Sequence, residues 1–172
     1  MARIEPPSSP TRRSRSAVVV LLVLAVVACG TGETGSGKLP AITLDAFDGA
    51  APLDLSRVAD HRPAVVNLWA TWCAPCRVEM PVLDAASTRH RGEIRFVGVN
   101  LGDDAGAART FLAEVGVGYP QFRDADSSLS GRLGVTGLPV TLLVARSGRV
   151  IQRLTGRLDD ARLERAIRRL MR

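Results

Sequence analysis

The segment PAVVNLWATWCAPC (63–76) constrains the fold of this chain more than any other. It opens with a dense run of β-branched and apolar side chains, which is typical of a strand buried on both faces. The chain then passes two cysteines, Cys73 and Cys76, and takes on a helical pattern from about Cys73 to His90. A buried strand that runs straight into a helix predicts an α/β sheet. Such folds place their chemistry at this carboxyl edge of the sheet.

The rest of the pattern predicts one α/β domain, residues 39–172, with a central mixed β-sheet flanked by helices. On the helix after the cysteines, Val78, Val82, Ala85 and Ala86 are expected to form the packing face. The other expected elements are a short edge strand within 40–47, a turn and a helical or irregular piece within 49–58, a buried strand at 94–101, a helix at 103–116, a β-hairpin from strands 140–145 and 149–154, and a C-terminal helix with Leu163, Ile167 and Leu170 on one stripe.

Residues 1–28 predict a secretory signal peptide. Four arginines against one acid precede an unbroken apolar run from Ala17 to Ala28. As a helix this run would span about 18 Å, which is too short for a bilayer core of about 30 Å. A basic segment, a short apolar core and a small residue at its end are typical of an export signal.

The end of this segment, VVAC (26–29), resembles the bacterial lipobox, in which the cysteine is lipidated and the chain is cut just before it. The alternative is an ordinary signal peptide with an incidental Cys29. Residues 29–38 are rich in Gly, Ser and Thr and predict a flexible tether. Lipidation of Cys29 would leave Cys73 and Cys76 as the only thiols of an extracytoplasmic domain. Since thiols outside the cytoplasm tend to pair, a Cys73–Cys76 disulfide is expected.

Neither a metal site nor a structural crosslink accounts for two cysteines at this spacing. A closed zinc site needs four ligands, and neither His61 nor His90 lies at a ligand-like offset from the pair, so no metal is expected. A disulfide that closes a four-residue loop constrains little of the unfolded chain.

Redox chemistry does explain the spacing. If the helix begins at about Cys73, this sulfur lies beside unpaired N–H groups and the positive end of the helix dipole, which favour the nucleophilic thiolate. Cys76 falls one turn further along and can attack a mixed disulfide to release the product. Cys73 is therefore expected to attack and Cys76 to resolve.

Two segments, NLWATWCAPCRVEMP (67–81) and GVTGLPVTLLVARSGRV (134–150), resemble the active-site segment and the cis-proline loop of the thioredoxin superfamily. More narrowly, they resemble its TlpA/ResA-like, redoxin-type branch of membrane-anchored extracytoplasmic thiol–disulfide oxidoreductases. The resemblance implies a thioredoxin-like fold and a cis Leu138–Pro139 bond that faces the cysteines. It also implies that main-chain groups at Leu138 hold an extended substrate. Trp72 is then expected to be exposed contact surface.

One departure from cytoplasmic thioredoxins concerns proton transfer. Where those proteins usually have a buried aspartate six residues before the first cysteine, this chain has Asn67, whose amide cannot take a proton. Glu79 matches a glutamate of the ResA-like branch and is the candidate replacement. A buried carboxylate at that position would have a raised pKa suited to acid–base work. The alternative is a solvated Glu79 that pairs with an arginine such as Arg77.

The resemblance implies a lipid-anchored, monomeric protein-disulfide reductase without a cofactor. A membrane thiol-electron donor would supply its electrons, and cysteine-containing exported proteins, apocytochrome c first among them, would be its clients. One alternative is a disulfide-forming oxidase, because the reduction potential sets the direction. A thiol peroxidase is disfavoured, since Val66 and Ala70 stand where peroxiredoxins have proline and threonine. A non-catalytic lipoprotein binding module is disfavoured because both cysteines and Pro139 are present.

Charge is distributed unevenly along the chain. Residues 146–172 hold nine arginines against three acids, whereas residues 29–145 carry a net negative charge. Beside a lipid anchor this basic face could contact anionic headgroups, or it could be a solvated helix face. Nucleic acid is not an expected partner outside the cell.

Overall fold

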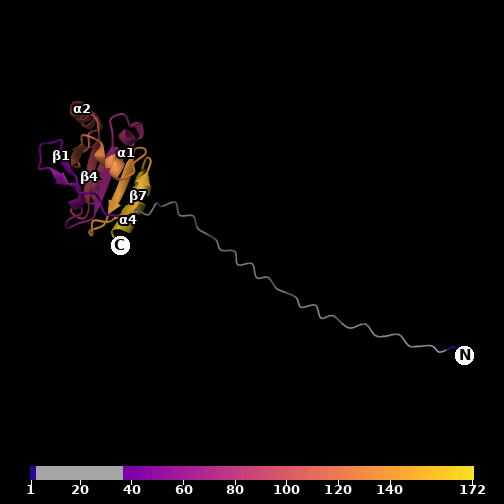
Figure 1. Ribbon diagram of the computed structural model, residues 1–172. Helices are drawn as coiled ribbons and strands as arrows, with labels where there is room; N and C mark the ends of the chain where they lie inside the picture. The colour runs from indigo at the N-terminus through magenta and orange to yellow at the C-terminus, as the bar shows by residue number, and fades with distance from the viewer. Residues whose placement is uncertain (3–36) are drawn as a thin grey trace. The chain divides into compact units, whose positions relative to one another are not determined.

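The computed structural model describes Met1, Ala2 and residues 37–172, and the fold is that of residues 37–172 (Figure 1). Beyond Met1 and Ala2, the predicted signal peptide lies outside the described residues. So do Cys29 and most of the tether, and these assignments stay predictions. Within the described part, no helix combines the length and the apolar character that a bilayer crossing requires.

Within residues 37–172, seven strands form one mixed sheet in the order β2-β1-β5-β4-β3-β6-β7. The strands are β1 (Thr43–Ala46), β2 (Leu53–Asp54), β3 (Ala64–Trp69), β4 (Arg95–Leu101), β5 (Gln121–Asp124), β6 (Val140–Val144) and β7 (Val150–Thr155). The central strands β3, β4 and β5 run parallel, and all other pairs are antiparallel. Every residue of β3 is buried, as its run of β-branched and apolar side chains predicts.

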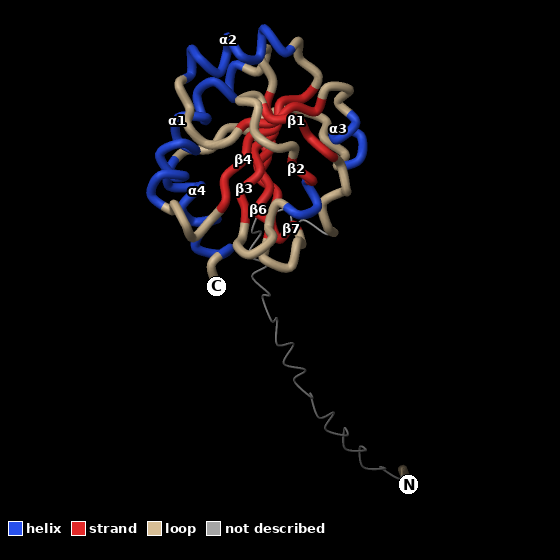
Figure 2. Tube along the Cα trace, turned by 90° about the vertical axis from the view of Figure 1, so that its left-hand side faces the viewer, coloured by secondary structure: helices blue, strands red, loops and turns tan. Residues whose placement is uncertain are grey.

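Helices cover both faces of this sheet. They are α1 (Ala74–Arg89), α2 (Ala105–Val115), α3 (Ser128–Arg132), α4 (Asp160–Leu170) and a 3-10 helix, η1 (Leu55–Arg57). Figure 2 shows α1, α2 and α4 on one side of the sheet and α3 on the other. Because successive residues of a strand point to opposite faces, Val66 and Leu68 pack with Leu129 of α3, while Val65 packs with Leu83 of α1. Asn67 and Trp69 therefore belong to the α1 side of β3.

The expected mixed sheet flanked by helices is confirmed, and so are the predicted strands 63–70 and 94–101, the hairpin and the C-terminal helix. The helix expected at 103–116 is α2, which ends at the left-handed Gly116. The strand expected at the edge is β1, which lies second from the edge because β2 pairs outside it. The pattern predicts none of β2, β5 and α3, whereas η1 agrees with the helical or irregular piece expected within 49–58.

The predicted packing face of α1 is wrong, because the helix buries a different side from the one expected. Val78 is 53% exposed and Ala85 is exposed, whereas Val82 is half-buried and only Ala86 is fully buried. The residues that α1 buries are Cys76, Glu79, Met80, Leu83 and Ala86. A face that includes a carboxylate does not stand out from an apolar pattern, because the burial of such a group depends on partners elsewhere in the chain.

Candidate active site

A tight turn carries the chain from β3 to the first cysteine. The N–H of Cys73 donates to the carbonyl oxygen of Ala70 at 3.1 Å, and α1 begins at the next residue. Cys73 is thereby the N-cap of α1, and its sulfur accepts the N–H of Cys76 at 3.2 Å. Pro75 lies in the first turn, where its missing N–H costs no helical hydrogen bond. The sequence thus folds so that one cysteine sulfur caps a helix.

The two cysteine sulfurs are bonded to each other. Their S–S distance is 1.97 Å and their Cα atoms lie 5.3 Å apart. Cys73 is 3% exposed and Cys76 is fully buried. When this bond is reduced, the unpaired N–H groups and the positive end of the α1 dipole stabilise a thiolate on Cys73. Cys73, the slightly more exposed of the two residues, therefore also occupies the helix position that favours a thiolate.

The proline loop lies at the same edge of the sheet. The peptide bond between Leu138 and Pro139 is cis, as predicted. The antiparallel pairing of β3 with β6 places Leu68 opposite Val140, so Pro139 lies beside the carboxyl end of β3, from which the cysteines follow. Leu138 packs against the buried cluster that contains Cys73 and Cys76. The two motifs, far apart in sequence, therefore meet in the fold.

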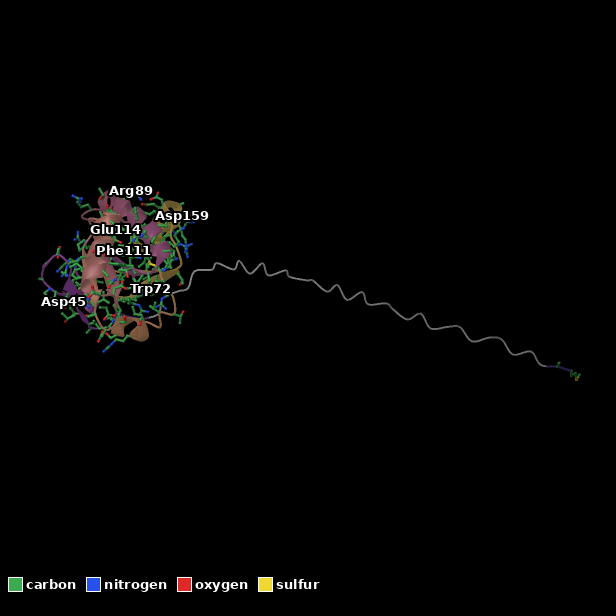
Figure 3. The ribbon with its side chains drawn as sticks, turned by 90° about the horizontal axis from the view of Figure 1, so that it is seen from above. Asp45, Trp72, Arg89, Phe111, Glu114 and Asp159 are labelled. Carbon is green, nitrogen blue, oxygen red and sulfur yellow. A yellow bond between two sulfur atoms is a disulfide. The ribbon has the colours of Figure 1, made fainter. Side chains whose placement is uncertain are left out.

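The two tryptophans near the cysteines have different environments. Trp69 is fully buried, donates its Nε1–H to Gln121 Oε1 at 2.9 Å and stacks on Phe111 at 5.1 Å between ring centroids. Trp72, next to Cys73, is 71% exposed (labelled in Figure 3). A large apolar side chain exposed to water beside the disulfide is available for contact with another molecule.

Glu79 is fully buried and has two hydrogen-bond donors. Asn67 donates its Nδ2–H to Oε1 at 2.7 Å, and the backbone N–H of Leu158 donates to Oε2 at 2.9 Å. Burial raises the pKa of Glu79 to about 7, while these hydrogen bonds and the charge of Arg162 act in the opposite direction. The alternative of a solvated Glu79 paired with Arg77 is wrong, since Arg77 pairs with Glu114 of α2.

Sequence reasoning missed the side chains that hold Asn67. Its Nδ2 also donates to Thr141 Oγ1 at 3.2 Å, and the hydroxyl of Tyr119 donates to its Oδ1 at 3.5 Å. Burial raises the pKa of Tyr119 above its usual range, so this hydroxyl stays a donor. The available signal was Thr141, a polar residue in the apolar strand β6 that lies opposite Asn67 in β3.

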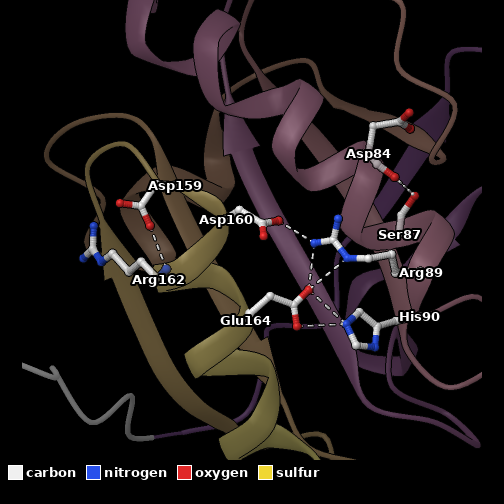
Figure 4. Close-up of polar contacts among 8 residues, drawn as sticks. All are labelled: Asp84, Ser87, Arg89, His90, Asp159, Asp160, Arg162 and Glu164. Carbon is white, nitrogen blue, oxygen red and sulfur yellow. Dashed lines mark hydrogen bonds and ion pairs between the residues drawn. The ribbon is translucent and has the colours of Figure 1, made fainter.

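Helix α4 begins two residues after Leu158, so the contact between Leu158 and Glu79 depends on the position of α4. Arg89 and His90, at the end of α1, bind the carboxylate of Glu164 on α4 at 2.7 and 3.2 Å (Figure 4). Asp159 caps α4 by accepting the N–H of Arg162 at 2.7 Å. The Leu158 N–H is thereby held against the buried face of α1.

Comparison with known proteins is consistent with this geometry. The Redoxin family model matches residues 35–167. The chain is 36% identical to the thiol:disulfide interchange protein HelX of Rhodobacter capsulatus over 124 residues, which cover 72% of this chain and 69% of HelX. It is 34% identical to the thiol:disulfide interchange protein DsbE of Escherichia coli K12 over 77% of this chain and 71% of that protein. With the thiol-disulfide oxidoreductase ResA of Bacillus subtilis, 30% identity covers 56% of this chain and 54% of ResA.

Solved structures show the same architecture. The structure of MTB dsbF, in its mixed oxidized and reduced forms, matches with a TM-score of 0.68 and 30% identity over 76% of this chain and 95% of that one. A thiol:disulfide interchange protein of the thioredoxin family from Chlorobium tepidum matches with a TM-score of 0.67 and 23% identity over 80% of this chain and 97% of that one. The fold is therefore thioredoxin-like.

Proposed function

Because the chain belongs to the Redoxin family and is a thiol–disulfide oxidoreductase, we propose that it reduces disulfide bonds of cysteine-containing proteins outside the cytoplasm. One observation carries the proposal: the sulfur of Cys73 caps α1 and accepts a helix N–H, while Cys76 lies buried one turn further along. This arrangement activates one sulfur for attack and keeps the other close enough to finish the reaction.

The exchange has two steps. The Cys73 thiolate attacks one sulfur of the client disulfide, forms a mixed disulfide and releases a client thiolate, which takes up a proton. The Cys76 thiol then loses its proton, and its thiolate attacks the Cys73 sulfur and releases the second client sulfur as a thiolate, which takes up the proton that Cys76 lost. The client gains two electrons and two protons, and the enzyme is left with the Cys73–Cys76 disulfide. A membrane thiol-electron donor is the proposed source of the electrons that restore the dithiol.

Glu79 is the proposed acceptor of the Cys76 proton. It lies one turn from Cys76 on the buried face of α1, and a carboxylate with a pKa of about 7 can both take and return a proton near neutral pH. Asn67 cannot take this proton, and its part is to hold the carboxylate.

Trp72, Leu138 and Pro139 are the proposed contacts with the client. Trp72 offers exposed apolar surface next to the nucleophile, and Leu138 precedes the cis bond at the same sheet edge. Main-chain groups at Leu138 can pair with an extended client segment in the manner of an added strand. Apocytochrome c is a proposed client, by the resemblance of the two motifs.

The proposed location is the outer face of the cell membrane, with Cys29 as the lipid-bearing residue. The support is the basic and apolar segment that ends in VVAC (26–29). Substitution Cys29→Ser should prevent lipidation and shift the protein out of the mature, membrane-bound fraction. Recovery of a mature lipidated form from this variant would contradict the assignment.

The order of the two sulfurs is tested by trapping. A Cys76→Ser variant lacks the resolving thiol and should accumulate mixed disulfides with its clients, visible as higher-mass bands that a reductant removes. A Cys73→Ser variant is the matched control and should trap far less, because the remaining thiol, Cys76, is fully buried and does not cap the helix. Stronger trapping by Cys73→Ser would reverse the assignment, and absence of trapping by either variant would oppose the exchange mechanism.

A further inference from the structure

Asp103, in the loop between β4 and α2, is a carboxylate that the mechanism above does not use. Its Oδ2 accepts the backbone N–H of Thr71 at 2.6 Å, and its Oδ1 accepts the hydroxyl of Thr71 at 2.9 Å. Thr71 is the second residue of the turn that the Cys73 N–H closes onto Ala70. A single side chain therefore holds both the main chain and the side chain of a residue in the turn before the nucleophile.

Asp103 is itself held by two neighbouring strands. Asn100 of β4, which is fully buried, donates its Nδ2–H to Asp103 Oδ2 at 2.6 Å. Arg123 of β5 donates from Nη2 to the main-chain oxygen of Asp103 at 3.3 Å. Asn100 is paired with Trp69 in the β3–β4 ladder and with Arg123 in the β4–β5 ladder. The carboxyl ends of three parallel strands are thus joined through Asp103.

The turn determines how Trp72 is presented. Trp72 is the third residue of this turn and is 71% exposed, so its direction depends on the backbone that carries it. Fixing that backbone before a client arrives reduces the conformational entropy that binding must overcome.

We propose that Asp103 is a positioning residue of the redox site, which fixes the turn from Ala70 to Cys73 and thereby the direction in which Trp72 meets a protein client. Asp103 transfers neither protons nor electrons. This proposal rests on the disulfide exchange proposed above, and the experiment below separates the two.

Two substitutions at this position separate geometry from charge. Asp103→Ala removes every side-chain bond to Thr71. Asp103→Asn keeps one oxygen that accepts the Thr71 N–H. Its new NH2 group can donate to the Thr71 hydroxyl, which then accepts a hydrogen bond instead of donating one. The matched control is Asp104→Asn. Asp104 is the adjacent, exposed acid and caps α2 through the N–H groups of Gly106 and Ala107, a task that asparagine performs equally well.

Two readouts are needed, both on the reduced protein. Iodide quenching of tryptophan fluorescence reports Trp72, because Trp69 is the only other tryptophan and is fully buried. Exchange rates are measured with a peptide that carries one intramolecular disulfide and with hydroxyethyl disulfide, which is too small to use Trp72. Asp103→Ala should raise the quenching constant and slow exchange with the peptide on the order of tenfold, with a smaller loss for hydroxyethyl disulfide. Asp103→Asn and Asp104→Asn should stay near wild type.

Unchanged quenching and peptide exchange in Asp103→Ala would overturn the proposal, as would equal losses for the peptide and the small disulfide. Equal defects in Asp104→Asn would also overturn it. If Asp103→Ala does not fold, Thr71→Val removes the hydroxyl bond alone, and its peptide rate should fall in the same direction. If wild-type protein exchanges with neither disulfide, the proposed function fails, while the quenching comparison still decides whether Asp103 holds the turn.

Discussion

At the scale of single residues, Glu79 and Asn67 act as a pair. Asn67 stands where a proton-accepting aspartate would be expected, and its amide instead donates to the buried carboxylate of Glu79. Thr141 and Tyr119 hold that amide in turn. The hydrogen-bond partners of Glu79 are thus neutral, and burial is the largest influence on its pKa, ahead of these hydrogen bonds and the charge of Arg162.

The raised pKa of Glu79 predicts a pH-dependent stability. Its pKa moves from 4.5 to about 7 on folding because burial disfavours the charged form. Between these values the folded state binds the proton more tightly than the unfolded chain does. The contribution of Glu79 is therefore fully present below its unfolded pKa and is lost as the pH rises through its folded pKa. The loss amounts to about 3 kcal/mol.

Denaturant unfolding of wild type and Glu79→Gln near about pH 5 and about pH 8 tests this. From the lower to the higher pH, the free energy of unfolding of wild type should fall by about 3 kcal/mol relative to that of Glu79→Gln, because glutamine has no proton to lose. The exposed Glu114→Gln is the control and should follow wild type. Parallel pH profiles for wild type and Glu79→Gln would oppose a shifted Glu79. The same substitution should alter the pH dependence of Cys73 alkylation if Glu79 acts as the proposed proton acceptor.

At the scale of elements, the sequence pattern predicts the strands in which apolar side chains predominate. Strands β3, β4 and β6 are such runs, although each buries one polar residue, Asn67, Asn100 or Thr141. Strand β5 is short and polar, and it buries Gln121 and Asp124. Gln121 accepts the Nε1–H of Trp69, which is distant in the sequence. Asp124 accepts the N–H of Leu129 in the nearby helix α3. Helix α3 has five residues, too few for a helical period to show.

The pairing of β4 with β5 predicts that Gly98 is required for its small size. A Cβ at Gly98 would lie 1.9 Å from Gln121 Oε1, the atom that accepts the Trp69 Nε1–H. Gly98→Ala should therefore lower the free energy of unfolding by about 1–3 kcal/mol, since the buried amide must move and lose its partner. Gly131→Ala in α3 is the control: its Cβ meets nothing within 4 Å, and alanine favours a helix. Equal stability of the two variants in denaturant unfolding would contradict this account of β4.

At the scale of the whole molecule, the described domain gathers its chemistry at one edge of the sheet. The two motifs, their order and the thioredoxin-like fold could be predicted from sequence, because each motif is a local pattern. The hydrogen bonds that fix the site could not be predicted, since they join residues far apart in the chain: Glu79 to Leu158, Asn67 to Thr141, and Thr71 to Asp103. A single buried polar residue carries no period, so only the folded chain shows which partner satisfies it.

The direction of electron flow is also a property of the whole molecule. It depends on the reduction potential of the Cys73–Cys76 couple and on the partners with which the domain exchanges electrons. A thiolate at the helix-capping position of Cys73 would stabilise the reduced form. A large stabilisation would raise the reduction potential and make the couple an oxidant. The two residues between the cysteines, Ala74 and Pro75, do not decide whether the couple acts as a reductant or as an oxidant.

The most direct test of the account is the reduction potential of the Cys73–Cys76 couple, measured by equilibration with glutathione or dithiothreitol and quantified by thiol alkylation. A reductase of exported proteins requires a potential well below about −120 mV, and we expect the couple to lie there. A potential near about −120 mV, the range of strong disulfide oxidants, would contradict the reductive function and assign the same two sulfurs to disulfide formation.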